Sequence, residues 1–280
     1  MTPSQPMPKR RAEAYLPLRG IARDLKRTLR RLVRSHGGPY LIAWAHRITG
    51  ILLALYVGFH IVTLSTLHHA ERFSAQMRFY GFFLFVFLEW VLALPVIFHA
   101  LNGGRLILYE VFGNRRDDTL IKWACALSAI YVLLLGLVMI IGSQAVSAAF
   151  FWLYTAAAAA GVTYIALCRI RRSGAGTAWK LQRITGAYLL LMVPAHLLFM
   201  HLNPSLGHDA RVIIERLRNP LMKLVDLTLV LSVLYHGAYG IWAIGQDYLP
   251  PGSLRKAFGA LVLGLVAWLS WIGMRLAIAI

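Results

Sequence analysis

The sequence is poor in charged residues, and above all in acidic ones. Only 14% of its 280 residues are Asp, Glu, Lys or Arg, with 11 acidic residues against 29 basic ones. Apolar residues instead make up 59% of the chain, and the mean hydropathy is +0.62. A water-soluble domain of this length carries far more surface charge. The composition therefore excludes an ordinary soluble helical protein.

Cysteine is equally scarce. Cys125 and Cys168 are the only two, and each lies within or at the end of an apolar segment. Two isolated thiols supply neither a disulfide framework nor the four thiolates of an ordinary iron–sulfur cluster. Any redox chemistry of this chain must therefore use another cofactor.

The apolar residues fall into seven blocks, each long enough to cross a bilayer, which takes about 20 helical residues. We predict an all-α membrane protein with spans at residues 42–67, 79–109, 120–142, 147–169, 180–202, 220–246 and 257–279. The N-terminus does not have the pattern of a signal peptide, because its basic stretch is too long and the first apolar block lacks a small-residue cleavage site.

The net charge of +18 is distributed as in a membrane protein rather than a nucleic-acid-binding one. Ten basic residues precede the first span, and most others fall in alternate loops. With the N-terminus inside, 20 basic residues lie on the inner side and seven on the outer side. The positive-inside rule thus predicts an integral inner-membrane protein with a cytoplasmic N-terminus and an external C-terminus.

Two segments outside the spans have amphipathic patterns. Residues 19–34 place apolar side chains on one helical stripe with Arg and Lys elsewhere, so we expect this helix to lie on inner-leaflet lipid or on a cytoplasmic partner. Residues 209–217 predict a short interfacial helix on the outer side.

The strongest signal is an internal duplication. Residues 46–60 (HRITGILLALYVGFH) match residues 182–196 (QRITGAYLLLMVPAH), and both have nine residues between R-I-T-G and His. At nearly the same offset, a second match pairs Glu89, His99, Gly103 and Glu110 with Asp226, His236, Gly240 and Asp247. Four spans separate equivalent points, so the two halves share one orientation. We predict two parallel three-helix repeats, 41–143 and 173–280, joined by a linking helix in 144–172 and preceded by a basic cytoplasmic segment, 1–40.

The duplication places four intramembrane histidines at equivalent positions: His60 with His196, and His99 with His236. One such histidine is usually a hydrogen-bonded packing residue, but four in a symmetric pattern favour a functional role. Neutral imidazole is an axial ligand of haem iron, and imidazoles on facing helices can clamp a haem within a bundle.

Depth along the helices predicts how these histidines pair. Measured from the inner ends of their spans, His60 lies roughly 20 Å deep and His99 roughly 16 Å; from the outer ends the values are about 12 Å and 28 Å. Both measurements put His99 nearer the inner side. We therefore predict one haem between His99 and His236, near the cytoplasm, and a second between His60 and His196.

Other histidines compete less well. His201 is a rival for the outer haem, but the duplication aligns it with Ser65. Four more lie in the basic segment or in outer loops and are most simply solvated: His36, His68, His69 and His208.

Haem propionates are anionic and need cationic partners in a low-dielectric setting. Arg47, Arg105 and Arg183 lie toward the inner ends of their spans and are predicted to fill that role; the alternative is snorkelling to inner-leaflet lipid. Gly103 and Gly240 follow the inner histidines by one turn. They either admit the flat macrocycle or permit close helix packing.

These motifs resemble the membrane anchors of succinate:quinone oxidoreductases, the succinate dehydrogenases and fumarate reductases. The first half, with HRITG and H-x3-G-x-R, is similar to the larger cytochrome b anchor. The second half, with QRIT, NPLMKLVD and H-x3-G-x6-DY, is similar to the smaller one. The resemblance covers residues 40–248 and implies a fusion of the two anchors.

The resemblance implies a respiratory electron-transfer subunit with two haem b groups, in which the His60–His196 pair corresponds to the additional haem of diheme members. A single-haem anchor remains the alternative. It implies no succinate site in this chain, and as partners a flavoprotein and an iron–sulfur subunit on the cytoplasmic face. Electrons would pass from the last iron–sulfur cluster to membrane quinone.

The resemblance also implies an inner quinone site formed by Arg47, Asp247, Tyr248 and His46. A tyrosine hydroxyl can hydrogen-bond a quinone carbonyl, and a neighbouring carboxylate or imidazole can relay protons; the alternative for Tyr248 is an interfacial belt tyrosine. The serine common in this site, three residues before the HR pair, is Ala43 here. Thr49 or Trp44 would replace it as donor, or quinone chemistry lies elsewhere.

Two acids lie near the outer ends of their spans, at the level of the outer pair. Glu89 and Asp226 suit proton transfer or an outer quinol site, as in diheme members that couple to the membrane potential. Alternatively they are interfacial acids paired with Lys223 or Arg78.

Two other protein classes stay open. A haem-A-synthase-like oxidoreductase would need eight spans and a different arrangement of acids around its histidines. A transporter built on parallel repeats would bind no haem, so a reduced-minus-oxidised absorbance spectrum distinguishes it.

Overall fold

The structure is a computed structural model that describes residues 37–142, 147–203 and 205–279. The predicted amphipathic helix at 19–34 and most of the basic segment 1–40 lie outside the described residues. The chain divides into two units, Met1–Ala45 and His46–Ile280, and the helix bundle described below belongs to the second.

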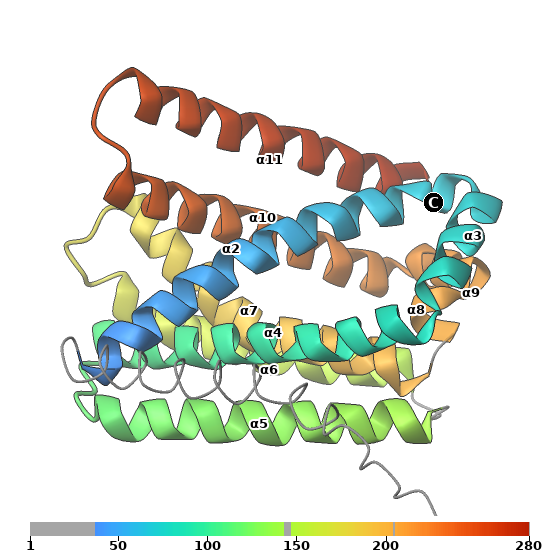
Figure 1. The fold of residues 1–280 in the computed structure, drawn as a ribbon, viewed down its shortest axis with the longest axis horizontal. Coiled ribbons are helices and arrows are strands. Elements are labelled where there is room, and N and C mark those ends of the chain that lie inside the picture. Colours follow the sequence, from blue (N-terminus) through green and yellow to red (C-terminus); the bar gives the residue numbers. More distant parts are fainter. Residues whose placement is uncertain (1–36, 143–146, 204, 280) are drawn as a thin grey trace, which may run out of the picture. The chain divides into compact units, whose positions relative to one another are not determined.

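Seven helices of the described residues are long and apolar enough to cross a membrane, and Figure 1 shows them. They are α2 (Gly38–Ser65), α4 (Phe83–Glu110), α5 (Asp117–Ile141), α6 (Ala148–Ile170), α7 (Thr177–Leu202), α10 (Pro220–Tyr248) and α11 (Ser253–Ala279). The described part of the chain contains no strand. The prediction of an all-α membrane protein with seven spans is confirmed.

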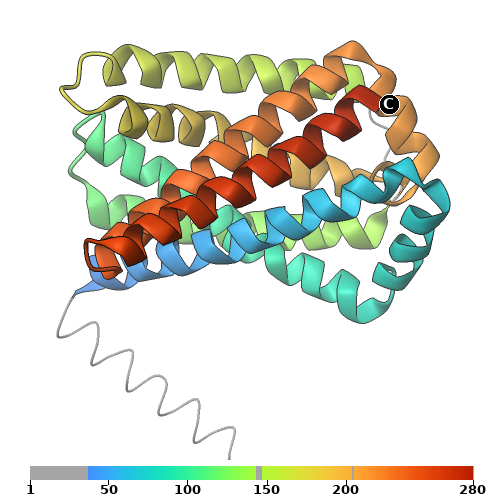
Figure 2. The same cartoon turned by 90° about the horizontal axis from the view of Figure 1, so that it is seen from above.

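Short helices gather at one end of the bundle, as Figures 1 and 2 show. They are η1 (Thr66–His68), α3 (Ala70–Tyr80), α8 (Ser205–His208) and α9 (Ala210–Arg218). The helix predicted at 209–217 is therefore confirmed as α9, whereas α3 was not predicted. Because α3 ends at Tyr80 and Phe82 is extended, α4 starts at Phe83 and not at residue 79. We call this end of the bundle the α9 end, and the opposite one the Arg183 end.

The starts of α9 and α10 follow ordinary capping chemistry. The Asn219 side chain accepts hydrogen bonds from the backbone N–H groups of Leu221 and Met222, and Pro220 occupies the first turn of α10. Asp209 caps α9 in the same way through Arg211. Asp117 lies in the first turn of α5, where the helix dipole favours an acid.

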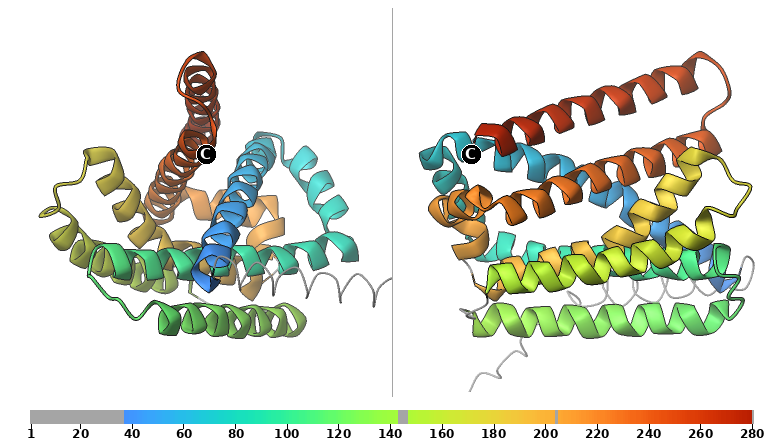
Figure 3. Two further views of the ribbon diagram at one scale, coloured as in Figure 1. Left: turned by 60° about the vertical axis from the view of Figure 1, so that its left-hand side comes forward. Right: turned by 180° about the vertical axis from the view of Figure 1, so that it is seen from behind.

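The packing order of the helices can be followed in Figure 3. α4 packs against α5 and α7, α7 against α6 and α10, and α11 against α10. Small residues bring these helices together: a Cβ on Gly136 of α5 would lie 2.7 Å from Nε1 of Trp90, and one on Gly245 of α10 would lie 2.2 Å from Cε1 of Phe258. Such contacts are typical of membrane helices, which associate through close packing rather than through a hydrophobic drive.

Helices α2 and α11 expose most of their apolar side chains. Ile61 is the one buried residue among those described in α2, and Phe59 and Leu263 are largely exposed. Exposed apolar residues on this scale would aggregate in water but suit a hydrocarbon environment.

Candidate functional site

The structure brings the four duplicated histidines into two pairs. The ring centres of His99 and His236 are 6.3 Å apart with their planes at 89°, and those of His60 and His196 are 6.3 Å apart at 83°. Each pair joins one helix of the first half to one of the second, α4 to α10 and α2 to α7. The inferred partners therefore lie together, while their role as iron ligands stays a prediction.

Glycines of the two RITG motifs make room for the inner histidines. A Cβ on Gly50 would lie 3.0 Å from Cε1 of His99, and a Cβ on Gly186 would lie 3.3 Å from Cε1 of His236. In both halves the outer histidine follows this glycine by ten residues, which is about 15 Å along a helix. Helices α2 and α7 thus give the same separation between the two levels.

Polar groups of the first half hold the His99 ring. Its Nδ1 lies 3.2 Å from the backbone oxygen of His46 and 3.2 Å from the hydroxyl oxygen of Thr49. The ring of His46 stacks on it at 4.0 Å between centres, with 7° between planes. An Nδ1–H that donates to a carbonyl oxygen leaves Nε2 with its lone pair free for a metal, the usual second-shell arrangement of histidine ligands.

Several buried polar atoms near the histidine pairs have no hydrogen-bond partner within the described part of the chain. They are Nδ1 of His46, His196 and His236, Nδ2 of Asn102 and Oε1 of Gln182. Each such atom costs about 1–3 kcal/mol when buried without a partner, so a cluster of them needs a physical explanation. Four of these five atoms belong to residues of the duplication. His46 and Gln182 occupy equivalent positions in it, and His196 and His236 are two of the candidate iron ligands.

The pair spacing can be tested against a metal clamped by two imidazoles. A metal–nitrogen bond is about 2 Å and each ligating nitrogen lies roughly 1 Å from its ring centre, so ring centres across one ion are roughly 6 Å apart. Both observed pairs meet this value. Two aromatic rings in direct edge contact also fall within about 4.5–7 Å, so the distance fits a haem without requiring one.

The described residues contain no group of three or more His, Cys, Asp or Glu side chains that would hold a bare metal ion. Pairs of histidines are what a haem needs, because the porphyrin supplies the other four nitrogens. The donor set therefore fits haem better than a protein-only metal centre.

At the Arg183 end, three basic residues predicted as propionate partners are each paired with an acid. Arg47 donates to Asp247 Oδ2 at 2.7 Å and to the Tyr248 hydroxyl at 2.7 Å. The other two pairs are Arg183 with Glu110 (2.6 Å) and Arg105 with Asp117. Arg105 is buried and also donates to Asn102 Oδ1 at 2.8 Å.

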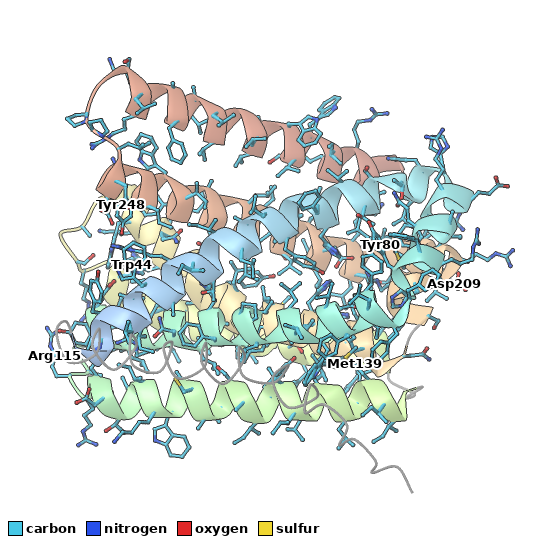
Figure 4. The ribbon with its side chains drawn as sticks, viewed as in Figure 1. Trp44, Tyr80, Arg115, Met139, Asp209 and Tyr248 are labelled. Carbon is cyan, nitrogen blue, oxygen red and sulfur yellow. The ribbon has the colours of Figure 1, made fainter. Side chains whose placement is uncertain are left out.

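The predicted inner quinone residues are partly assembled. Arg47 contacts both Asp247 and Tyr248, and Figure 4 labels Tyr248 at the end of the bundle opposite to Asp209. His46 and Thr49 instead contact His99. Trp44 and Ala43 belong to the other unit of the chain.

At the α9 end, the two predicted acids have partners that the sequence did not indicate. Glu89 lies 3.3 Å from Nε2 of His201, and Asp226 lies 3.5 Å from Arg216, in place of Lys223 or Arg78. Nδ1 of His201 lies 2.6 Å from the backbone oxygen of Leu197. Both ring nitrogens of His201 are thus engaged, which separates it from its rival His196.

Aromatic side chains surround the outer pair. Tyr56 stacks on His60 with 5.6 Å between ring centres, and Trp152 of α6 lies 6.2 Å from His196. Trp152 belongs to an apolar cluster with Met192 and Phe199. Sequence reasoning missed Trp152 because α6 lies outside the duplication.

Comparison with known proteins gives a family. The model of the family described as "Succinate dehydrogenase/Fumarate reductase transmembrane subunit" matches residues 23–138 and 165–273. A relative, the succinate dehydrogenase hydrophobic membrane anchor subunit of Archaeoglobus fulgidus, is 33% identical over 95 residues, which cover 33% of this chain and 77% of the relative. No solved structure matches the chain.

Proposed function

Because the chain belongs to the succinate dehydrogenase/fumarate reductase transmembrane subunit family, we propose that it is a diheme cytochrome b anchor. In this proposal it carries electrons between an iron–sulfur subunit and membrane quinone. The observation that carries it is the equal geometry of two histidine pairs about 15 Å apart along their helices. The same ring spacing occurs at both levels, between positions that the duplication relates.

Haem b, when bound, supplies a one-electron centre whose potential depends on its ligands and surroundings. His99 and His236 would hold the inner haem through Nε2, and His60 and His196 the outer one. Thr49 and the His46 carbonyl orient the His99 ring from the opposite edge. The four rings are each partly buried between helices of the bundle, which limits the access of water to the iron-binding nitrogens.

Two parallel three-helix repeats form the proposed architecture, with α6 as the linking helix. Matched contacts support it: Gly50 faces His99 as Gly186 faces His236, and Thr49 donates to the His46 carbonyl as Thr185 does to that of Gln182. The family model also matches two stretches that flank most of α6. This arrangement is that of two fused anchors.

The Arg183 end is proposed to face the cytoplasm and to dock the flavoprotein and iron–sulfur subunits. The charge distribution supports this orientation, since few acids offset the basic residues there. Those basic residues are Arg47, Arg105, Arg115, Arg116, Lys122, Arg169, Arg171, Arg172, Lys180, Arg183, Arg255 and Lys256. The C-terminus then lies outside.

Quinone is proposed to bind beside Tyr248 and Asp247 at this end. Both side chains are half exposed while Arg47 holds them together. The Tyr248 hydroxyl can donate to a quinone carbonyl, and Asp247 can exchange a proton with water. Glu89 and Asp226 are proposed to serve proton transfer or a second quinol site at the α9 end.

The test is the haem content and the reduced-minus-oxidised spectrum of the purified complex. We expect two haems per chain, one lost in His60→Ala or His196→Ala, and both retained in His201→Ala, a control at the same level. One haem in the wild type, unaffected by His60→Ala, would select the single-haem anchor. A colourless complex would instead indicate that this membrane protein binds no haem.

A further inference from the structure

Helix α9 carries a basic side chain that turns inward at the α9 end. Ile213 and Leu217 of this helix are buried, whereas Arg211 and Arg218 are exposed. Arg216 lies on the buried side, with 12% of its side chain exposed. A guanidinium in that position must exchange water for other partners.

The partners that Arg216 has are poor. NH2 lies 3.5 Å from Asp226 Oδ2, NH1 lies 3.5 Å from the sulfur of Met200, and Nε is buried without a partner among the described residues. Charge-assisted hydrogen bonds are ordinarily about 2.7–2.9 Å, and a thioether is a weak acceptor. By contrast, Arg183 meets its carboxylate at 2.6 Å.

The contacts of Arg216 place it beside the outer histidine pair. Met200 follows His196 by four residues on α7, so it lies one helical turn, about 6 Å, toward the α9 end on the same face. Asp226 precedes His236 by ten residues on α10, which puts it about 15 Å from the inner level and therefore at the outer one. The Arg216 guanidinium lies between these two side chains.

We propose that Arg216 binds a propionate carboxylate of the outer haem. This inference rests on the proposed function, which supplies that haem. A carboxylate would satisfy the guanidinium donors that Asp226 and Met200 leave poorly bonded, and the planar fork of arginine suits it. The cation would also stabilise the reduced, less positive haem and so raise its potential.

A purely structural role for Arg216, tying α9 to α10 through Asp226, makes a different prediction. In that case removal of either partner has the same consequence, a looser α9. If the arginine acts on the haem by its charge, removal of the cation lowers the outer potential and removal of the neighbouring carboxylate raises it. The direction in which each of the two substitutions shifts the outer haem potential therefore distinguishes the two roles.

The experiment is a potentiometric titration of the purified full complex, with the outer component identified as the one missing from His60→Ala. In Arg216→Gln we expect the ratio of reduced to oxidised outer haem at fixed potential to fall about tenfold, which is 59 mV for one electron. Arg216→Lys keeps most of the wild-type value, and Asp226→Asn shifts it upward. Arg218→Gln, an exposed cation on the same helix, changes nothing.

The outcomes are distinguishable. A wild-type complex with fewer than two haems overturns the proposed function. Two haems with an outer potential and occupancy unchanged in Arg216→Gln overturn only the role of Arg216. Equal downward shifts in Arg216→Gln and Asp226→Asn assign Arg216 to helix docking and overturn the inference as well.

Discussion

The two histidine levels have the same ring geometry but different surroundings. At the inner level, His99 is fixed by a threonine hydroxyl, a carbonyl and a stacked ring, and the nearby arginines are closely paired with acids. At the outer level, His196 lies against Trp152, and Arg216 is loosely paired with Asp226. Two histidine pairs with matching ring geometry can thus lie in different electrostatic surroundings.

Breaking the ion pair between Arg105 and Asp117 at the Arg183 end should have the largest effect on stability. Arg105→Gln leaves Asp117 without its partner beside a buried site, and removal of one member of a buried pair costs about 3–5 kcal/mol. Asp226→Asn, which removes a looser contact at 3.5 Å between partly buried side chains, should cost less, about 1 kcal/mol. Thermal unfolding of the purified complex measures both. Equal losses would remove the contrast between the two levels.

The quinone site is the next place where the two ends can be compared. Tyr248→Phe removes the proposed donor and should lower the rate of quinone reduction about 100-fold with haem content unchanged. Glu89→Gln at the α9 end should leave this rate within about twofold if quinone is reduced at the Arg183 end. Steady-state assays with a soluble quinone analogue test both. A larger loss of this rate in Glu89→Gln would indicate that quinone is reduced at the outer level.

Crowding one histidine should affect one level only. Gly50→Ala places a methyl group 3.0 Å from Cε1 of His99, so the ring must shift, and overpacking of this kind costs about 1–3 kcal/mol. We expect a lower content of the inner haem. Gly58→Ala is the matched control on α2, since its Cβ meets nothing closer than 3.9 Å. Loss of the outer haem in Gly50→Ala would contradict the assigned levels.

The smallest effect is expected from the hydroxyl beside His99. Thr49→Val removes a contact worth about 0.5–1.5 kcal/mol and should shift the inner potential slightly. Thr185→Val is its counterpart in the second half, where the hydroxyl bonds the backbone oxygens of Leu181 and Gln182. Redox titration of both variants measures the difference. A shift in Thr185→Val alone would assign the orienting role to the second half.

Several features could be read from sequence because they depend on local chemistry. Apolar length fixed the seven spans, and the amphipathic pattern after Asp209 gave α9. Helix α3 was missed because residues 68–78 lie between two predicted spans and are too few and too polar to form one, while residues 79 and 80 were included in the second span. The partners of Glu89 and Asp226 were also missed, since loop length does not determine which cation reaches an acid across the bundle.

By itself the sequence determined the membrane class, the seven spanning helices and the duplicated histidines, because hydrophobic length and repeat spacing act along one chain. Only the tertiary structure decided which side chains meet: that Gly50 opens space for His99, that His201 is occupied by Glu89, and that Arg216 turns toward Met200. Such contacts depend on the rotation and crossing of packed helices, and membrane helices are oriented by close packing at a few small residues rather than by a hydrophobic stripe.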